Sequence, residues 1–435
     1  MKKRILIAAL TAAMASSIFG VTVNAAEREL NINWLSSRSA SESAILAIQD
    51  IAKQYQEENP DLDFNFEIEN ISDRTAYLQK LKILAASDEL PEWFDSDPDT
   101  WFADIVADGK AYSFEDLYKE LGMYDQIFPI SKEYARLSDG SLNLMTLQCN
   151  TEYFFYNKDL FEQAGITETP KTFDEFVAAC ETINEKGYNA YGFGIADDST
   201  ATSSLLGYLE NSYYHNNEEA NPDGTDFDTK FAMGEVTMDG HINDCVNKWC
   251  TLVEKGLIAS ESLGISCQEM LNSFKNGEVA FLHGGPWQYT ELKESGVNFK
   301  MLPQLSETGE NEYVLGGPAA CFGINVNTEN HDGAEAALTA LASVEVQQAF
   351  ADANVGGTSY RSGVEAQMPE EYEYVADIIN NGNIAFPSDR WSVNLPSQSL
   401  FDEFTAQLQG VISGDISGDD LVNAIDTKAD SIRYE

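Results

Sequence analysis

Apolar and polar residues alternate near the start of the chain with the two-residue period of a half-buried strand. This period covers 30–34, where Leu, Ile and Trp alternate with Asn, and it returns at 64–68 with Phe, Phe and Ile. Apolar residues at three- and four-residue spacing over 44–55 and 77–86 predict helices, and a short strand is expected at 93–94. Because a strand, a helix and a strand follow one another as in a βαβ unit, the N-terminal region is predicted to be α/β.

A second series of elements begins after Gly140, where the pattern changes. A polar stretch over 208–228 interrupts this series and is predicted to be a surface loop or excursion. No internal repeat is found, which argues against an adhesin or a polysaccharide scaffold. The series is expected to comprise an apolar run at 142–156, helices at 172–183 and 242–253, strands at 279–282 and 321–326, helical sequence over 333–353, and two closing helices from 400 onward.

The N-terminus has the pattern of an export signal. Basic residues at 2–4 precede an apolar run over 5–20 and small residues at 23–26, which predicts a signal peptide over 1–25. An exported chain of this kind is expected in the periplasm or outside the cell, associated with the cell envelope. No lipobox cysteine follows the signal, since the first cysteine is Cys149, and no later stretch has the roughly 20 apolar residues of a membrane span.

Length and charge narrow the class of protein further. The chain has 435 residues, more than one hydrophobic core usually serves, so two domains are expected. It carries 26 basic and 72 acidic residues, for a formal net charge of −46. A surface this acidic repels nucleic acid and anionic lipid, so no nucleic-acid partner is expected, and neutral or cationic ligands fit better than anionic ones.

The chain lacks the sequence signatures of the common hydrolases and nucleotide enzymes. It contains no G-x-S-x-G, no H-E-x-x-H, no phosphate loop and only four histidines, and its six cysteines form no C-x-x-C pair. We therefore expect no catalytic residue, no metal, no cofactor and mostly free thiols. A secreted glycoside hydrolase remains the alternative, because 72 acidic residues guarantee candidate carboxylate pairs without favouring any one of them.

Several segments, taken in order, resemble the family 1 extracellular solute-binding proteins of ABC importers. Each segment alone is a weak signal, whereas their order and spacing together are specific and cover nearly the whole chain after the signal. The matching segments are 156–161, 164–165, 169–176, 274–280, 284–287, 316–317 and 322–325.

The resemblance implies two α/β lobes that are joined by three crossing segments and close on a ligand in the cleft between them. Lobe one would comprise 26–147 plus 320–353, and lobe two 148–319 plus 354–435. The implied function is to bind a carbohydrate, expected to be an oligosaccharide, outside the cytoplasmic membrane and to deliver it to the permease subunits of an ABC importer. We expect this protein to be a monomer and not an enzyme.

A sugar site needs aromatic rings for the flat C–H faces of the sugar, and carboxylates, amides or Arg for its hydroxyls. Trp287 follows a turn through Gly285 at the end of a predicted strand, and the resemblance implies that its ring stacks on the sugar. The alternative is a half-buried core tryptophan.

Acidic residues follow the strand predicted at 93–94. Asp95, Asp97, Asp99 and Trp101 lie in this loop, and Asp99 is the leading candidate for accepting sugar hydroxyls. The D-x-D-x-D pattern also opens a calcium loop, but the Gly and Glu that such a loop requires are missing. The remaining candidates, for each of which a surface or core role stays open, are Asn150, Glu152, Arg38, Arg390, Trp391 and Phe401.

Overall fold

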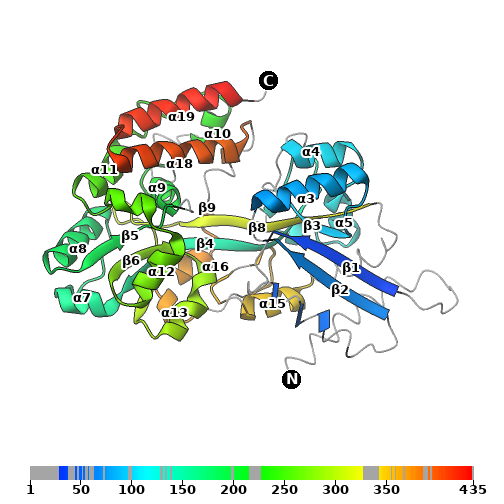
Figure 1. Ribbon diagram of the computed structural model, residues 1–435, viewed down its shortest axis with the longest axis horizontal. Helices are drawn as coiled ribbons and strands as arrows, with labels where there is room; N and C mark the ends of the chain where they lie inside the picture. Colours follow the sequence, from blue (N-terminus) through cyan, green and yellow to red (C-terminus); the bar gives the residue numbers. More distant parts are fainter. Residues whose placement is uncertain are drawn as a thin grey trace. The chain divides into compact units, whose positions relative to one another are not determined.

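The chain folds into two compact units (Figure 1). Unit 1 comprises Met1–Cys149 and Pro318–Gln367, and unit 2 comprises Asn150–Gly317 and Met368–Glu435. The sequence places the boundaries between the lobes at 147/148, 319/320 and 353/354, whereas the units meet at 149/150, 317/318 and 367/368. The computed structural model describes residues 29–37, 45–46, 49–50, 52–53, 57, 63–71, 74–96, 100–127, 131–132, 135–137, 140–196, 200–214, 227–326, 342–353, 355–357, 359–365, 368–385, 390–391 and 394–433.

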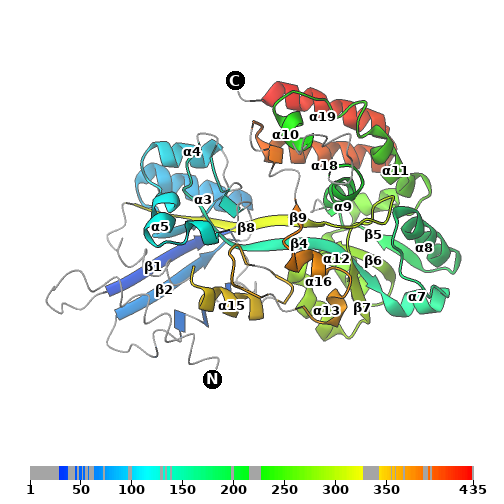
Figure 2. The same cartoon turned by 180° about the vertical axis from the view of Figure 1, so that it is seen from behind.

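Unit 1 is built on parallel strands, as the N-terminal βαβ pattern predicts. β1 (Glu29–Ser36) lies between β2 (Asp63–Asn70) and β3 (Trp93–Asp95) and is parallel to both, and Figures 1 and 2 show β1 and β2 side by side. β3 pairs antiparallel with the last residues of β8 (Val314–Ile324). The helices of this unit are α3 (Arg74–Ser87), α4 (Thr100–Ala107), α5 (Phe114–Glu120), the 3-10 helix η1 (Tyr124–Gln126) and α15 (Val344–Ala353).

The apolar face of β1 packs into an aromatic core. Trp34 and Trp93 are buried with ring centroids 6.0 Å apart, and Phe322 of β8 lies 5.4 Å from Trp93. Asn33, the residue before Trp34, is exposed, so the two-residue period does separate a core face from a solvent face.

Unit 2 is built around β4 (Met145–Asn157), which begins in unit 1. β4 pairs antiparallel with both β6 (Val279–Gly284) and β7 (Phe299–Leu302), and β6 pairs parallel with β5 (Asn189–Gly192). The start of β8 pairs with β9 (Ile384–Ala385).

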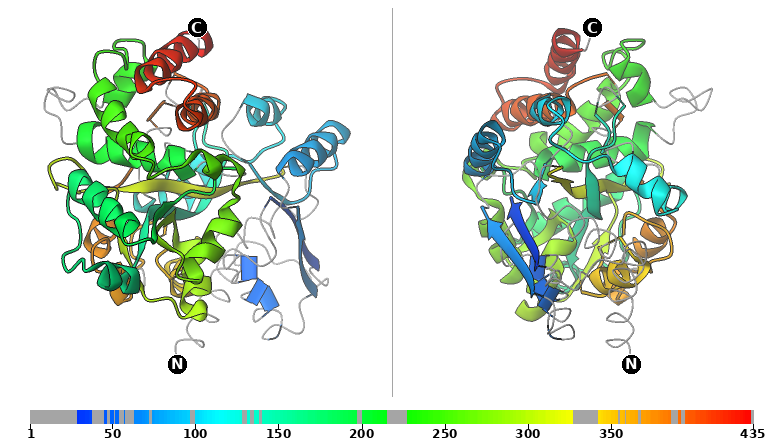
Figure 3. Two further views of the ribbon diagram at one scale, coloured as in Figure 1. Left: turned by 60° about the vertical axis from the view of Figure 1, so that its left-hand side comes forward. Right: turned by 90° about the vertical axis from the view of Figure 1, so that its right-hand side faces the viewer.

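Several helices of unit 2 begin at a side-chain cap that the sequence supplies. Asn157 caps the first turn of α7, Thr172 caps α8, and Ser417 forms a capping box with Asp420 at the start of α19. Figure 3 shows α18 and α19 side by side in both views. The helices are α7 (Lys158–Ala164), α8 (Phe173–Glu185), α9 (Thr200–Leu209), α10 (Phe227–Ala232), α11 (Asn243–Glu254), α12 (Cys267–Lys275), α13 (Tyr289–Ser295), α16 (Ala376–Asn380), α18 (Ser397–Ser413) and α19 (Gly418–Ile432), with the short helices η2 (Glu210–Tyr214), η3 (Ser260–Gly264), η4 (Pro286–Gln288) and η5 (Glu370–Tyr372).

The expectation of a surface loop over 208–228 is wrong for the part of that stretch that the structure describes. Tyr208 lies in the last turn of the buried helix α9. Tyr213 and Tyr214 are buried in η2, which directly follows α9. Phe227 also returns to the core, where its ring stacks on Tyr214 at 5.8 Å. The polar residues of the stretch lie between apolar and aromatic residues that form one buried helical face. Residues 215–226 lie outside the described part.

Each unit has its own apolar core among the described residues. One cluster contains Trp34, Trp93 and Phe322, and the other contains residues such as Trp249 and Phe281. No helix within the described ranges combines the length and the hydrophobicity that crossing a bilayer requires. The α/β class predicted from the sequence is confirmed.

Candidate functional site

Strand direction brings several predicted residues together at one edge of the unit 2 sheet. β5 and β6 are parallel, so their carboxyl ends share an edge, and β4 runs antiparallel to β6 with Tyr153 opposite Gly284. The residues just before Tyr153, namely Asn150 to Glu152, therefore lie beside the turn that follows β6. In α/β sheets this carboxyl edge is where ligands bind.

Trp287 lies in this turn, within η4, and 49% of its surface is exposed. A Cβ atom on Gly285 would lie only 2.2 Å from Cζ3 of the Trp287 ring and 2.7 Å from the carbonyl oxygen of Thr151. The indole therefore lies close against the main chain of Gly285, and only glycine leaves room for it there. The turn holds a large aromatic side chain in place while leaving half of it accessible.

Asn150 and Glu152 occupy the adjoining residues of β4, and both are partly buried. β8 comes very close to this strand, because a Cβ atom on Gly316 would lie 2.2 Å from the carbonyl oxygen of Asn150. Gly316 also has a φ of 152°, which disfavours any residue with a side chain. Strand contact beside the candidate site therefore requires glycine at position 316.

A buried histidine and a buried glutamine lie directly beneath this edge. The side-chain nitrogen of Gln304 is 3.1 Å from the Glu152 carbonyl oxygen and 3.0 Å from Nε2 of His283. Nδ1 of His283 lies 3.8 Å from a carboxylate oxygen of Glu152. Burial lowers the pKa of His283 to about 3, so its ring is neutral at ordinary pH.

In unit 1, the carboxylate of Asp95 is held inside the fold at the carboxyl end of β3. It accepts hydrogen bonds from Trp34 Nε1 at 2.7 Å, from Ser36 Oγ at 2.8 Å and from the Ser37 amide at 2.7 Å. The first acidic residue of the predicted loop thus ties β1 to β3. Asp97, Asp99 and Arg38 lie outside the described residues, and of Trp101 only the main chain in α4 is described.

Arg390 and Trp391 are held by carboxylates in the interior of unit 2. The Arg390 guanidinium forms ion pairs with Glu210 and Asp228, whose side chains are fully buried. The Trp391 ring is buried, donates its N–H to Asp228 at 3.0 Å and stacks on Phe404 at 5.4 Å. Phe401 lies on α18 and packs partly buried against the same core. Arg390 and Trp391 thus help to stabilise the interior of unit 2.

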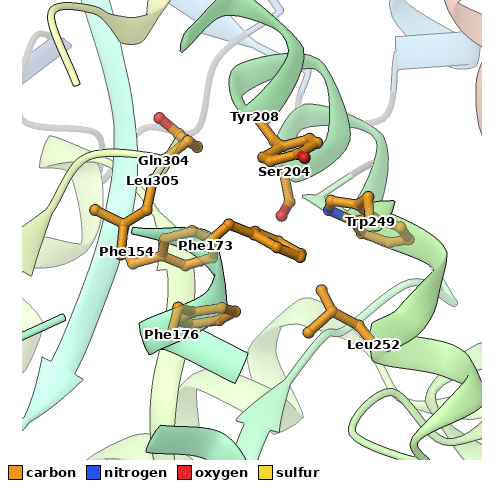
Figure 4. A pocket seen from close by; sticks show the side chains of 9 residues that line it. All are labelled: Phe154, Phe173, Phe176, Ser204, Tyr208, Trp249, Leu252, Gln304 and Leu305. Atoms are coloured by element: carbon orange, nitrogen blue, oxygen red, sulfur yellow. The ribbon is translucent and has the colours of Figure 1, made fainter. Parts of the chain in front are cut away.

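A small enclosed space lies within unit 2, as Figure 4 shows. Its free volume is about 10 Å³, too little for more than one water molecule, and most of its wall is aromatic or aliphatic. Two of its polar groups are already bonded, since Ser204 pairs with the Tyr191 hydroxyl at 3.1 Å and the Tyr208 hydroxyl donates to Glu307 at 2.8 Å. A sugar would find few partners there, so this space is a gap in core packing. Its lining residues are Phe154, Phe173, Phe176, Ser204, Tyr208, Trp249, Leu252, Gln304 and Leu305.

All six cysteines are free thiols in the structure. Burial raises the pKa of the Cys245 and Cys250 thiols to about 12, which makes them poor nucleophiles and metal ligands. Over the described residues, no three His, Cys, Asp or Glu side chains lie close enough to hold a metal ion.

Sequence reasoning did not single out His283 or Gln304 as residues that shape the site. His283 was visible as one of only four histidines, placed directly before the Gly-Gly-Pro-Trp turn. Gln304 carried no local signal, because its partner in β4 is 152 residues away.

The sequence profile of a family described as bacterial extracellular solute-binding protein matches residues 50–377. A binding protein of Brucella abortus (strain 2308) is 24% identical over 258 residues, which cover 58% of this chain and 57% of that protein. The sn-glycerol-3-phosphate-binding periplasmic protein of the same organism is 23% identical over 51% of this chain and 50% of its own. The chain therefore matches little more than half the length of these curated relatives.

Solved structures are similar to this chain over nearly its whole length. A family 1 extracellular solute-binding protein from Bifidobacterium longum subsp. infantis has a TM-score of 0.67 and 24% identity, covering 93% of this chain and 100% of that one. A chitin oligosaccharide binding protein has a TM-score of 0.72 and 20% identity, covering 93% and 99%. At these identities the likeness establishes a shared two-lobed solute-binding fold.

Proposed function

Because the chain belongs to the family of bacterial extracellular solute-binding proteins, we propose that it captures a neutral oligosaccharide outside the cytoplasmic membrane and delivers it to the permease subunits of an ABC importer. The observation that carries the sugar assignment is Trp287, a half-exposed indole held against Gly285 at the carboxyl edge of the sheet. Such a ring offers the apolar surface on which a pyranose packs.

The polar groups beside Trp287 favour a neutral ligand over an anionic one. Glu152 supplies a partly exposed carboxylate, and Asn150 supplies an amide beside it. A carboxylate accepts hydrogen bonds from sugar hydroxyls, whereas it repels a phosphate ester such as the one named for the Brucella relative. In this proposal Trp287, Gly285, Asn150 and Glu152 of unit 2 contact the ligand.

The solved relatives support an oligosaccharide as the ligand class. They include a chitin oligosaccharide binding protein and the solute-binding protein RafE in complex with raffinose. Asp99, Asp97, Trp101 and Arg38 remain predicted ligand contacts from unit 1, with Asp99 the leading one. We propose that the protein acts as a monomer and without a cofactor.

Calorimetric titration with a panel of neutral oligosaccharides and sn-glycerol 3-phosphate tests this function. We expect one or more oligosaccharides, such as raffinose, chitin or xylan fragments, to bind, and we expect the phosphate ester not to bind. Binding of the phosphate ester alone would contradict the assignment of a neutral ligand.

We also propose that the protein is not an enzyme and releases its ligand chemically unchanged. Long incubation with the tightest-binding oligosaccharide, followed by mass analysis, is expected to return the intact sugar. Cleavage products in excess over the protein would instead place the chain with the secreted glycoside hydrolases, which cleave with a pair of carboxylates.

A further inference from the structure

The side chain of Gln304 links three strands of unit 2 from a fully buried position. Its amide nitrogen donates to the Glu152 carbonyl of β4 at 3.1 Å and to His283 of β6 at 3.0 Å. Its amide oxygen accepts the Leu315 amide of β8 at 3.5 Å. Only 1% of the residue is exposed, so these contacts replace water. One side chain therefore connects the three strands that meet at the candidate site.

The bonding pattern defines which nitrogen of His283 carries the proton. Because the Glu152 carbonyl can only accept, the Gln304 atom facing it is the amide nitrogen, and the same nitrogen must donate to His283 Nε2. Nε2 is then unprotonated and the proton of the neutral ring resides on Nδ1. Nδ1 is buried without a hydrogen-bond partner among the residues that the structure describes, and it lies 3.8 Å from a carboxylate oxygen of Glu152, where its N–H dipole favours the negative charge.

Helix α9 fixes Gln304 from the opposite side. A Cβ atom on Gly207 would lie 2.6 Å from Cγ and 2.7 Å from Cδ of Gln304. Real side chains do not approach so closely, so Gly207 is required for Gln304 to occupy its place. The glutamine is thus held sterically by a helix and by hydrogen bonds to the sheet.

We propose that Gln304 and His283 are positioning residues for the ligand site, which set the spacing between Trp287 and Glu152. His283 is four residues before Trp287 on the segment that carries the indole, and Glu152 lies on the neighbouring strand. A sugar that stacks on the indole while donating to the carboxylate needs both at a fixed separation, and a shift of about 1 Å is enough to weaken such contacts. This inference rests on the proposed function.

Two variants disturb the pair in different ways. Gln304→Met keeps the length of the side chain and removes its hydrogen bonds, whereas Gly207→Ala leaves the chemistry of Gln304 intact and displaces it. The matched control is Gly410→Ala in α18, where the new Cβ would lie 3.1 Å from the flexible Ile416 side chain. All three changes disturb packing in unit 2, but only the first two touch the pair.

Titration of the tightest-binding oligosaccharide of the panel, together with the melting temperature, separates positioning from simple stabilisation. We expect both Gln304→Met and Gly207→Ala to weaken binding by about tenfold or more, and Gly410→Ala to leave affinity unchanged even where it lowers the melting temperature. Affinity within about twofold of wild type in both test variants would overturn the positioning role. Absence of any oligosaccharide binding by the wild-type protein would instead overturn the proposed function.

Nitrogen NMR of the wild-type protein gives a readout that does not depend on a variant folding. His283 should show an unprotonated Nε2 and a protonated Nδ1, and this tautomer should persist from about pH 5 to 8 because its pKa lies near 3. A protonated Nε2 would contradict the donation from Gln304 and with it the proposed link between the strands.

Discussion

Replacing Trp287 by alanine is expected to weaken oligosaccharide binding by about 2–4 kcal/mol, as the loss of a central aromatic contact does in other complexes. This corresponds to a roughly 30- to 1000-fold loss of affinity. Folding stability should change little, because 49% of the side chain is already exposed and its removal opens no closed cavity. Calorimetric titration of the sugar and thermal melting of the ligand-free protein measure the two effects separately.

Gly285→Ala provides an independent test of the same ring. The added methyl would lie 2.2 Å from Cζ3 of Trp287, so the indole must leave its place although it remains in the chain. We expect a smaller loss of affinity than for Trp287→Ala. We also expect the sugar-induced change in tryptophan fluorescence to become smaller than in the wild-type protein.

Tyr374→Ala is the matched control for these two variants, because Tyr374 is another aromatic residue of unit 2 with 40% of its surface exposed. Its hydroxyl pairs with Thr169 and its ring lies beneath Lys300, so it has a surface environment of its own. Its loss should leave affinity unchanged. If Trp287→Ala lowers the melting temperature but leaves the affinity for sugar unchanged, the ring stabilises the core and does not bind the sugar.

Local periodicity was sufficient to predict the strands and helices that bury one face. The alternation at 30–34 became β1, the helical spacing at 172–183 became α8, and the strand at 279–282 became β6. In these segments burial follows directly from sequence spacing, because neighbouring positions on one face share one environment. The position of Trp287 after a strand and a glycine turn was visible for the same reason.

Sequence reasoning could not identify partners that lie far away along the chain. Arg390 resembled a ligand clamp, but it pairs with Asp228, 162 positions earlier in the chain, and with Glu210, 180 positions earlier. Asp95 belonged to an acidic loop by its neighbours, yet it is bonded to Trp34, 61 positions earlier. A pattern within a window of a few residues contains no information about such pairs. A charged residue is therefore predicted to be exposed when its partner is distant in the sequence.

The buried ion pairs of Arg390 lead to the second large effect. Arg390→Met is expected to destabilise unit 2 by about 3–5 kcal/mol, because it leaves the buried carboxylates of Glu210 and Asp228 without the guanidinium that offsets their desolvation. Methionine retains most of the aliphatic volume, so the loss is one of charge compensation and not of packing. Denaturant unfolding followed by circular dichroism measures it.

A surface ion pair of the same unit supplies the control for this change. Lys255 pairs with Glu181 at 2.5 Å, and both side chains are 43% exposed. Lys255→Met should therefore cost only about 0–1 kcal/mol, since water already compensates both charges. Adding Glu210→Gln and Asp228→Asn to Arg390→Met should recover part of the lost stability, because the uncompensated charges are then removed together. Unchanged stability of Arg390→Met, combined with weaker sugar binding, would contradict this structural role and return Arg390 to the ligand contacts predicted from the sequence.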